Sequence, residues 1–105
     1  MSKIAIVLKE NHIDHTVLFK IKKVIDKSLQ DIKQRIEGRN PLYIGLLFYN
    51  DHAVIATQLQ ELVDVLDDCQ VLYWIYELDE LSSDLEENQK ISKEVLERIL
   101  DWQVE

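Results

Sequence analysis

Hydrophobic positions along the chain follow two alternating periods, one typical of strands and one of helices. Three runs are rich in branched and aromatic residues and largely apolar on both faces, as expected of covered strands. They are Lys3–Lys9, Leu42–Tyr49 and Val71–Leu78. The runs between them place apolar residues three and four positions apart, which predicts helices. These are expected over Asp14–Lys27, Leu29–Glu37, Ala53–Asp68 and residues 91–104.

Polar residues mark where the helices begin and end. Asn11 or Asp14 is the candidate N-cap of the first helix, and Ser28 offers a second N-cap after a bend. Gly38 is well placed as a C-terminal cap, and Pro41 ends the unit. The predicted order is β-α(α)-β-α-β-α, an α+β fold with a three-stranded sheet. We expect a single domain, 1–105, with its core over 3–78, an acidic connection over 79–90 and a C-terminal helix over 91–104.

The composition favours one folded domain. The chain has 105 residues, of which 47% are hydrophobic and 30% charged, with only two Gly and one Pro. Such a chain buries enough surface for one core and has too little Gly and Pro for disorder. The single cysteine, Cys69, excludes an intrachain disulfide and a cysteine-based zinc site. The apolar run Ile4–Leu8 is too short for a signal peptide, and no stretch is long enough to span a membrane. We therefore expect a cytoplasmic protein.

Charge is divided unequally along the chain. Residues 1–40 carry a net charge of +4 and residues 41–105 a net charge of −12, which gives −8 overall. The acidic part would repel nucleic acid and an anionic membrane, and it would attract a basic protein. The alternative is that charge of this size only keeps a small protein in solution.

The most acidic stretch follows the third predicted strand. VLYWIYEL is succeeded by DELSSDLEEN, and the whole run contains no basic residue. Carboxylates opposed to Lys and Arg on a partner speed association and narrow partner choice. We therefore predict a partner-binding surface made of Tyr76, Glu77, Asp79, Glu80, Asp84, Glu86 and Glu87. The alternative is a solvated connection before the last helix, and an exposed face of Val71–Leu78 would also support a homodimer.

The sequence offers no convincing catalytic or metal site. His12 and His15 form an H-x-x-H pair, and a structural metal site needs about four ligands, of which His52 would be a distant third. Asp51 beside His52 is an alternative acid–base pair, although an N-cap followed by an ordinary first-turn residue is the better explanation. Four lysines between residues 20 and 27 would form a weak nucleic-acid footprint, which the interleaved acids oppose. We expect a non-enzymatic protein without metal or cofactor.

Several positions carry a resemblance to a known domain. IAIVLKE opens the first strand, Ser28–Lys33 starts a second short helix, Pro41-Leu42 opens the second strand, and Leu59–Leu66 lies along the long helix. On these positions residues 4–78 resemble the C-terminal domain of the bacterial ribosomal stalk protein, whose fold is similar to that of the Clp-protease adaptor for destabilising N-termini. The stalk domain's glycine-rich helix junction and its basic, alanine-rich long helix are missing here. The resemblance implies a docking module in translation or proteolysis.

A second resemblance is one of overall profile. In size, acidity, single-domain organisation and lack of catalytic motifs the chain is similar to bacterial immunity proteins, small inhibitors that block a cognate toxin. This resemblance implies a basic toxin, such as a nuclease, as the partner of the acidic surface. We expect that function first and the docking module as the alternative.

Overall fold

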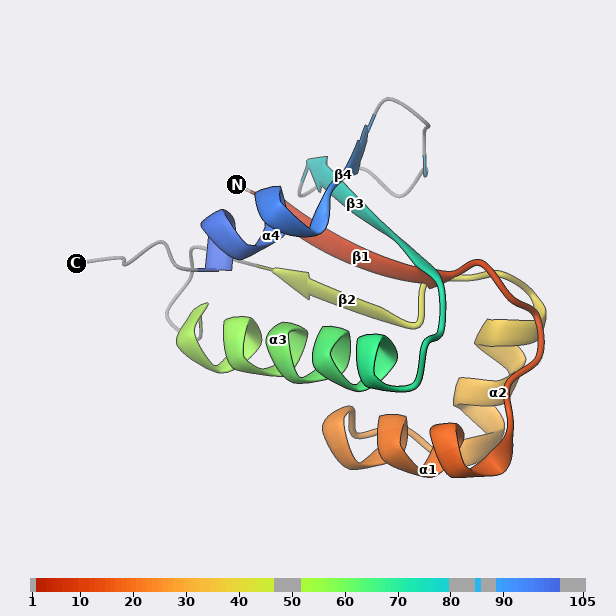
Figure 1. Cartoon of the computed structure of the whole chain (residues 1–105). Helices are drawn as coiled ribbons and strands as arrows, with labels where there is room; N and C mark the ends of the chain where they lie inside the picture. The colour runs from red at the N-terminus through yellow and green to blue at the C-terminus, as the bar shows by residue number, and fades with distance from the viewer. Residues whose placement is uncertain (1, 47–51, 80–84, 86–88, 101–105) are drawn as a thin grey trace.

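The computed structural model describes residues 2–46, 52–79, 85 and 89–100. Its elements follow in the order β1 (Ser2–Leu8), α1 (His15–Val24), α2 (Leu29–Glu37), β2 (Tyr43–Leu46), α3 (His52–Asp68), β3 (Tyr73–Asp79), β4 (Lys90–Ile91) and α4 (Lys93–Leu100) (Figure 1). The α+β class is therefore confirmed, as is the predicted order of elements up to β3.

β1 is a central strand of an antiparallel four-stranded sheet with the order β2-β1-β3-β4. It pairs with β2 on one side and with all of β3 on the other, so β2 and β3 run in the same direction. The prediction of three strands is wrong because β4 adds a fourth, in which Lys90 pairs with Tyr76 and Ile91 with Ile75. A strand of two residues has no hydrophobic alternation that a sequence pattern can reveal.

β2 lies at an edge of the sheet, although its apolar sequence predicts a central or fully covered strand. Ile44 is 46% exposed on it. Its other face is in close contact with α3, since a Cβ added to Gly45 would lie 2.6 Å from Cγ2 of Ile55. The apolar character of β2 therefore reflects the close packing of one of its faces against α3. It does not indicate how many strands flank β2.

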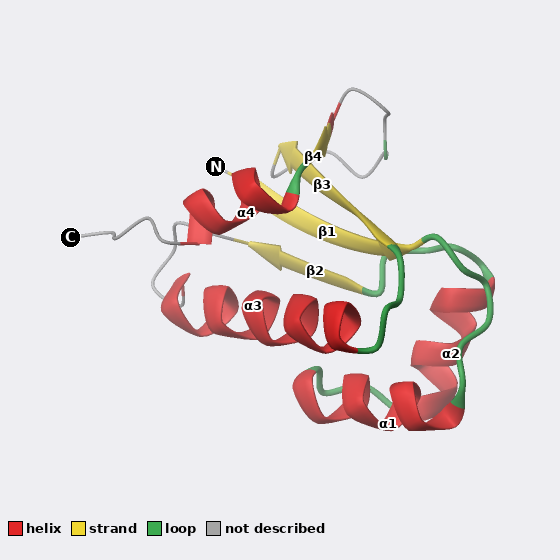
Figure 2. Cartoon of the chain, in the orientation of Figure 1, coloured by secondary structure: helices red, strands yellow, loops and turns green. Residues whose placement is uncertain are grey.

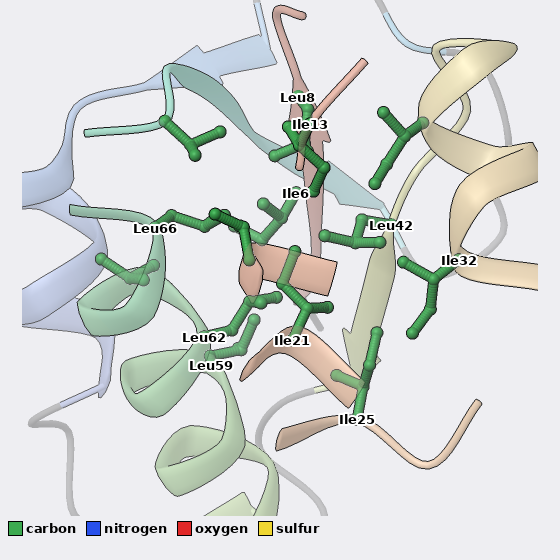
Figure 3. Close-up of a cluster of buried hydrophobic side chains, with 14 of the residues drawn as sticks. Ile6, Leu8, Ile13, Ile21, Ile25, Ile32, Leu42, Leu59, Leu62 and Leu66 are labelled. Atoms are coloured by element: carbon green, nitrogen blue, oxygen red, sulfur yellow. The ribbon is translucent and has the colours of Figure 1, made fainter. Parts of the chain in front are cut away.

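The main hydrophobic core lies between one face of the sheet and the four helices (Figure 3). Ile4, Ile6 and Leu8 point into it from β1, because alternate residues of a strand share one face. The helices contribute Ile21, Ile32, Leu59, Leu62, Leu66 and Leu96, each at most 1% exposed. Burying one such side chain stabilises the fold by roughly 1.5–3 kcal/mol.

The opposite face of the sheet carries a second, smaller apolar cluster. Ala5 and Val7 of β1 and Tyr76 and Leu78 of β3 are buried there, with Trp74 and Leu85 packed against them. Among the described helices, none contributes a residue to this cluster, in agreement with their position on the other side (Figure 2). The described helices therefore cover one face of the sheet, and the small apolar cluster lies on the other.

Side-chain caps set the helix boundaries. The Asp14 carboxylate accepts a hydrogen bond from the Val17 N–H, and the Ser28 hydroxyl accepts one from the Asp31 N–H, each at 3.1 Å. These bonds confirm Asp14 and Ser28 as N-caps. α1 ends at Val24, earlier than predicted, because Ile25 turns extended and buries its side chain in the core.

Candidate functional site

The predicted acidic run is only partly within the described residues. Glu80, Asp84, Glu86 and Glu87 lie outside them, and of Asp79 the structure describes only the backbone, at the end of β3. Tyr76 is 8% exposed and belongs to the second apolar cluster. Glu77 pairs with Ile4 of the main core face, so Tyr76 and Glu77 point to opposite sides of the sheet. The structure does not bring these two side chains together.

A second acidic surface is built by α3 and α4, which contact each other. α3 contains no Lys or Arg, and its exposed stripe becomes acidic from Glu61 onward. Carboxylates in the last turn of α3 oppose the helix dipole, which costs roughly 0.3–1 kcal/mol each at exposed positions. We define the acidic helix surface as the exposed side chains Glu61, Asp64, Asp67, Asp68, Glu94 and Glu97.

The side chain of Asp67 links α3 to β3 and to α4. The Tyr73 hydroxyl of β3 donates a 2.9 Å hydrogen bond to Oδ1 of Asp67, and the Lys93 ammonium of α4 donates to Oδ2. We call these three residues the Asp67 cluster. Burial raises the pKa of the Tyr73 phenol, and the hydrogen bond with Asp67 and its charge raise that pKa further. The hydrogen bond with Asp67 likewise raises the pKa of the Lys93 ammonium.

Positive charge gathers on the other side of α3, on the first two helices. α3 contacts both α1 and α4, which are drawn below and above it in Figure 1. Lys20, Lys22 and Lys23 of α1 and Lys33 of α2 are exposed, whereas Arg35 is held by Asp31 at 3.0 Å and by the Pro41 carbonyl at 3.1 Å. The exposed lysines of α1 and α2 therefore lie apart from the acidic helix surface, with exposed acids such as Asp26 and Glu37 among them.

The histidines do not converge in the part of the chain that the structure describes. His12 lies in the connection before α1 and His15 begins that helix, and both side chains are exposed. His52 begins α3, and its predicted neighbour Asp51 lies outside the described residues. Among the described residues, no group of three or more His, Cys, Asp or Glu is placed to hold a metal ion.

The sequence places several acids at the end of α3, but no local pattern relates them to α4. Asp67 and Lys93 are 26 residues apart, and their contact depends on how α4 packs against α3. An acid-rich last turn opposes the helix dipole, and that mismatch is the local signal that could have indicated this surface.

Comparisons with protein-family models, curated proteins and solved structures give no match for this chain. In the described ranges, every helix falls short of the length and apolar character required to cross a membrane.

Proposed function

We propose that this chain is a non-enzymatic protein-binding domain, most concretely a cytoplasmic bacterial immunity protein that binds and neutralises a basic toxin such as a nuclease. The observation that carries the proposal is the acidic helix surface. Six exposed carboxylates from two helices share it with only Lys93 and Arg98. The lysines of α1 lie on the far side of α3 and leave this surface strongly negative.

Charge separation of this kind favours encounter with a basic partner. Complementary potentials raise association rates from about 10⁵–10⁶ to as much as about 10⁸–10⁹ M⁻¹s⁻¹ at low salt. Tight binding also requires apolar contacts at the centre of the interface. Val95 on α4, next to Glu94 in the chain, is 38% exposed, and Val54 near the start of α3 is 60% exposed, so both helices also present apolar area.

The test is capture of the partner from a native lysate, followed by quantitative binding to charge-reversal variants. In one variant Glu61, Asp64 and Asp68 are changed to Lys, and in another Asp79, Glu80, Glu86 and Glu87 are changed to Lys. We expect a basic protein whose affinity falls roughly 100-fold when the surface in contact is reversed. If that protein is a nuclease, addition of the chain should stop its cleavage of nucleic acid.

The matched control reverses Lys20, Lys22 and Lys23 to Glu, which changes charge on α1 instead. This control should keep or increase the affinity. Unchanged affinity in both acidic variants would reject an electrostatic interface. Recovery of a basic partner whose activity continues in the saturated complex would reject the inhibitor function while retaining a binding function.

The exposed acidic stripe of α3 also supports a second candidate, a stalk-like or adaptor-like docking module in translation or proteolysis. In that case the captured partners would be components of those machines, with α3 as the contact. Hydrogen-exchange protection mapping shows whether the partner contacts α3 or another part of the chain. If exchange along α3 is unchanged in the complex, the docking-module proposal fails.

A further inference from the structure

The two edges of the described sheet are built differently. The sheet has the order β2-β1-β3-β4, so β2 and β4 each have a strand on one side only (Figure 2). Native proteins protect edge strands from further pairing by short length, by charge or by proline. β4 has two residues, one of which is Lys90. β2 has four residues and lies within the run Leu42–Tyr49, LYIGLLFY, which has no charged residue and no proline.

The register of the sheet shows which way the main-chain groups of β1 point. The Lys9 N–H donates a 3.0 Å hydrogen bond to the Leu72 carbonyl, which continues the pairing of β1 with β3. Successive residues of a strand direct their N–H and C=O groups to opposite sides, so Ala5, like Lys9, directs its groups toward β3. Ile6 directs its groups toward β2, and its carbonyl accepts a 2.7 Å hydrogen bond from the Leu42 N–H. The residues of β1 that bond to β2 are therefore the even-numbered ones.

Ile44 consequently presents its main chain to the outside of the sheet. Its pair in β1 is Ala5, which bonds to β3, so this pair carries no hydrogen bonds between β1 and β2. The N–H and C=O groups of Ile44 point away from β1, and those of Leu46, two residues further on, do the same. The Ile44 side chain is 46% exposed on the face opposite the helices, where Ala5 also lies. This edge thus offers both hydrogen-bonding groups and apolar area.

The helix side of the same edge has an exposed apolar residue as well. α3 lies along β2 (Figure 1), and the Tyr43 hydroxyl donates a 2.5 Å hydrogen bond to Oε1 of Gln58. Val54 precedes Gln58 by one helical turn, so the two lie on the same side of α3. Val54 is 60% exposed. Apolar contact is therefore available on both sides of the sheet beside β2.

We propose that a second copy of this chain pairs with β2 along this edge, antiparallel to it, so that two four-stranded sheets join into one. Two-fold symmetry requires a surface that matches itself. The edge meets this condition, because with Gly45 on the two-fold axis Ile44 of each copy hydrogen-bonds to Leu46 of the other. Uncharged segments of high strand propensity also pair readily with identical segments.

Charge favours this edge over the rest of the surface for such a contact. Each chain carries a net charge of −8, so two copies approach with least repulsion where the contact is uncharged. Strand pairing of this kind is closed to β3, whose face was the other candidate for a homodimer, because β1 and β4 occupy both of its edges. The β2 edge contains no residue of the acidic helix surface, so the inference does not depend on the proposed immunity function.

The test follows the full chain over a concentration range of about 10 µM to 1 mM, because a short strand contact is expected to be weak. Sedimentation should show a reversible monomer–dimer equilibrium that strengthens with salt, since salt screens the repulsion between two acidic chains. Amide hydrogen exchange, followed by nuclear magnetic resonance, should slow at Ile44 and Leu46 as the dimer forms. The amides of Tyr43 and Gly45 face β1 and should be protected at every concentration, so they serve as internal controls.

The variant Ile44→Lys should weaken dimerisation roughly tenfold or more, because pairing would desolvate the new charge at the edge. Leu72→Lys is the matched control. Leu72 is 59% exposed and is separated from β2 by β1, so its replacement should leave the dimer unchanged. Ile44→Thr keeps a β-branched side chain and should weaken the dimer by a smaller factor, which provides a second measurement if the lysine disturbs the fold.

Three results would overturn the proposal. The first is a dimer in which the Ile44 and Leu46 amides exchange as fast as they do in the monomer. The second is a dimer with equal stability in Ile44→Lys and Leu72→Lys. The third is a chain that remains monomeric at about 1 mM, even where a different protein protects the Ile44 amide, since the occupant of the edge would then not be a second copy.

Discussion

The replacement Leu96→Ala tests how α4 is held on the domain. Leu96 is 1% exposed and is the residue of α4 that is buried in the main core. Ile99 and Leu100 are half-buried at the edge of that core, and Val95 is 38% exposed. Docking of α4 therefore depends chiefly on one side chain and on the contact of Lys93 with Asp67.

The expected loss follows from burial. Removing a fully buried leucine side chain costs about 2–5 kcal/mol. In a domain of this size, about 1 kcal/mol corresponds to about 4–8 °C in melting temperature. An eight-residue helix is not stable alone, so α4 should unfold once its docking is lost. The loss of global stability therefore cannot exceed the free energy with which α4 docks on the domain.

Hydrogen exchange with mass spectrometry distinguishes local from global loss. In Leu96→Ala, amides of α4 should exchange much faster than in the unmodified chain, while those of α1 and α2 should remain protected. Val95→Ala is the matched control, since it shortens a neighbouring exposed side chain and should change stability by at most about 0.5 kcal/mol. If α4 in Leu96→Ala stays as protected as before, this account of its docking is refuted.

Three further changes test other parts of the fold. Gly45→Ala should destabilise the domain by about 1–3 kcal/mol in chemical denaturation, because the new Cβ would overlap Ile55, and an unchanged midpoint would contradict that close contact. Ser28→Ala removes the cap of α2 and should cost about 1 kcal/mol, whereas Ser28→Gly should cost only a few tenths. The pKa of Tyr73 is higher in the folded state than its ordinary value of 10.0. The stability that this difference contributes is fully present below pH 10 and is lost as the pH rises above 10. Tyr73→Phe should therefore flatten the fall in unfolding free energy above pH 10, and an identical pH profile would argue against the Asp67 contact.

Local sequence patterns predicted most of this fold because its elements carry their own periodicity. The spacing from Val17 to Ile36, interrupted by Ser28, indicated two helices, and the structure has both. Strand neighbours were not readable, since the pairing of β1 with β2 and β3 joins residues 37 to 77 positions apart.

The candidate sites show the same limit. The acids of α3 lie on one helix and can be read along it, whereas the Asp67 cluster combines residues of α3, β3 and α4. A site assembled from several segments can be predicted from a sequence only after the strand order and the helix packing are known.

The central position of β1 has a consequence for how the chain is made. β1 is synthesised before the other elements of the domain, yet its longest partner, β3, ends only at Asp79. At about 5–20 residues per second, a ribosome needs roughly 4–15 s to deliver that partner. Until then the branched apolar residues of β1 have no complete sheet to join. Such non-local pairing slows folding and leaves a nascent strand exposed to other chains, so this domain is expected to depend on chaperones more than its small size suggests.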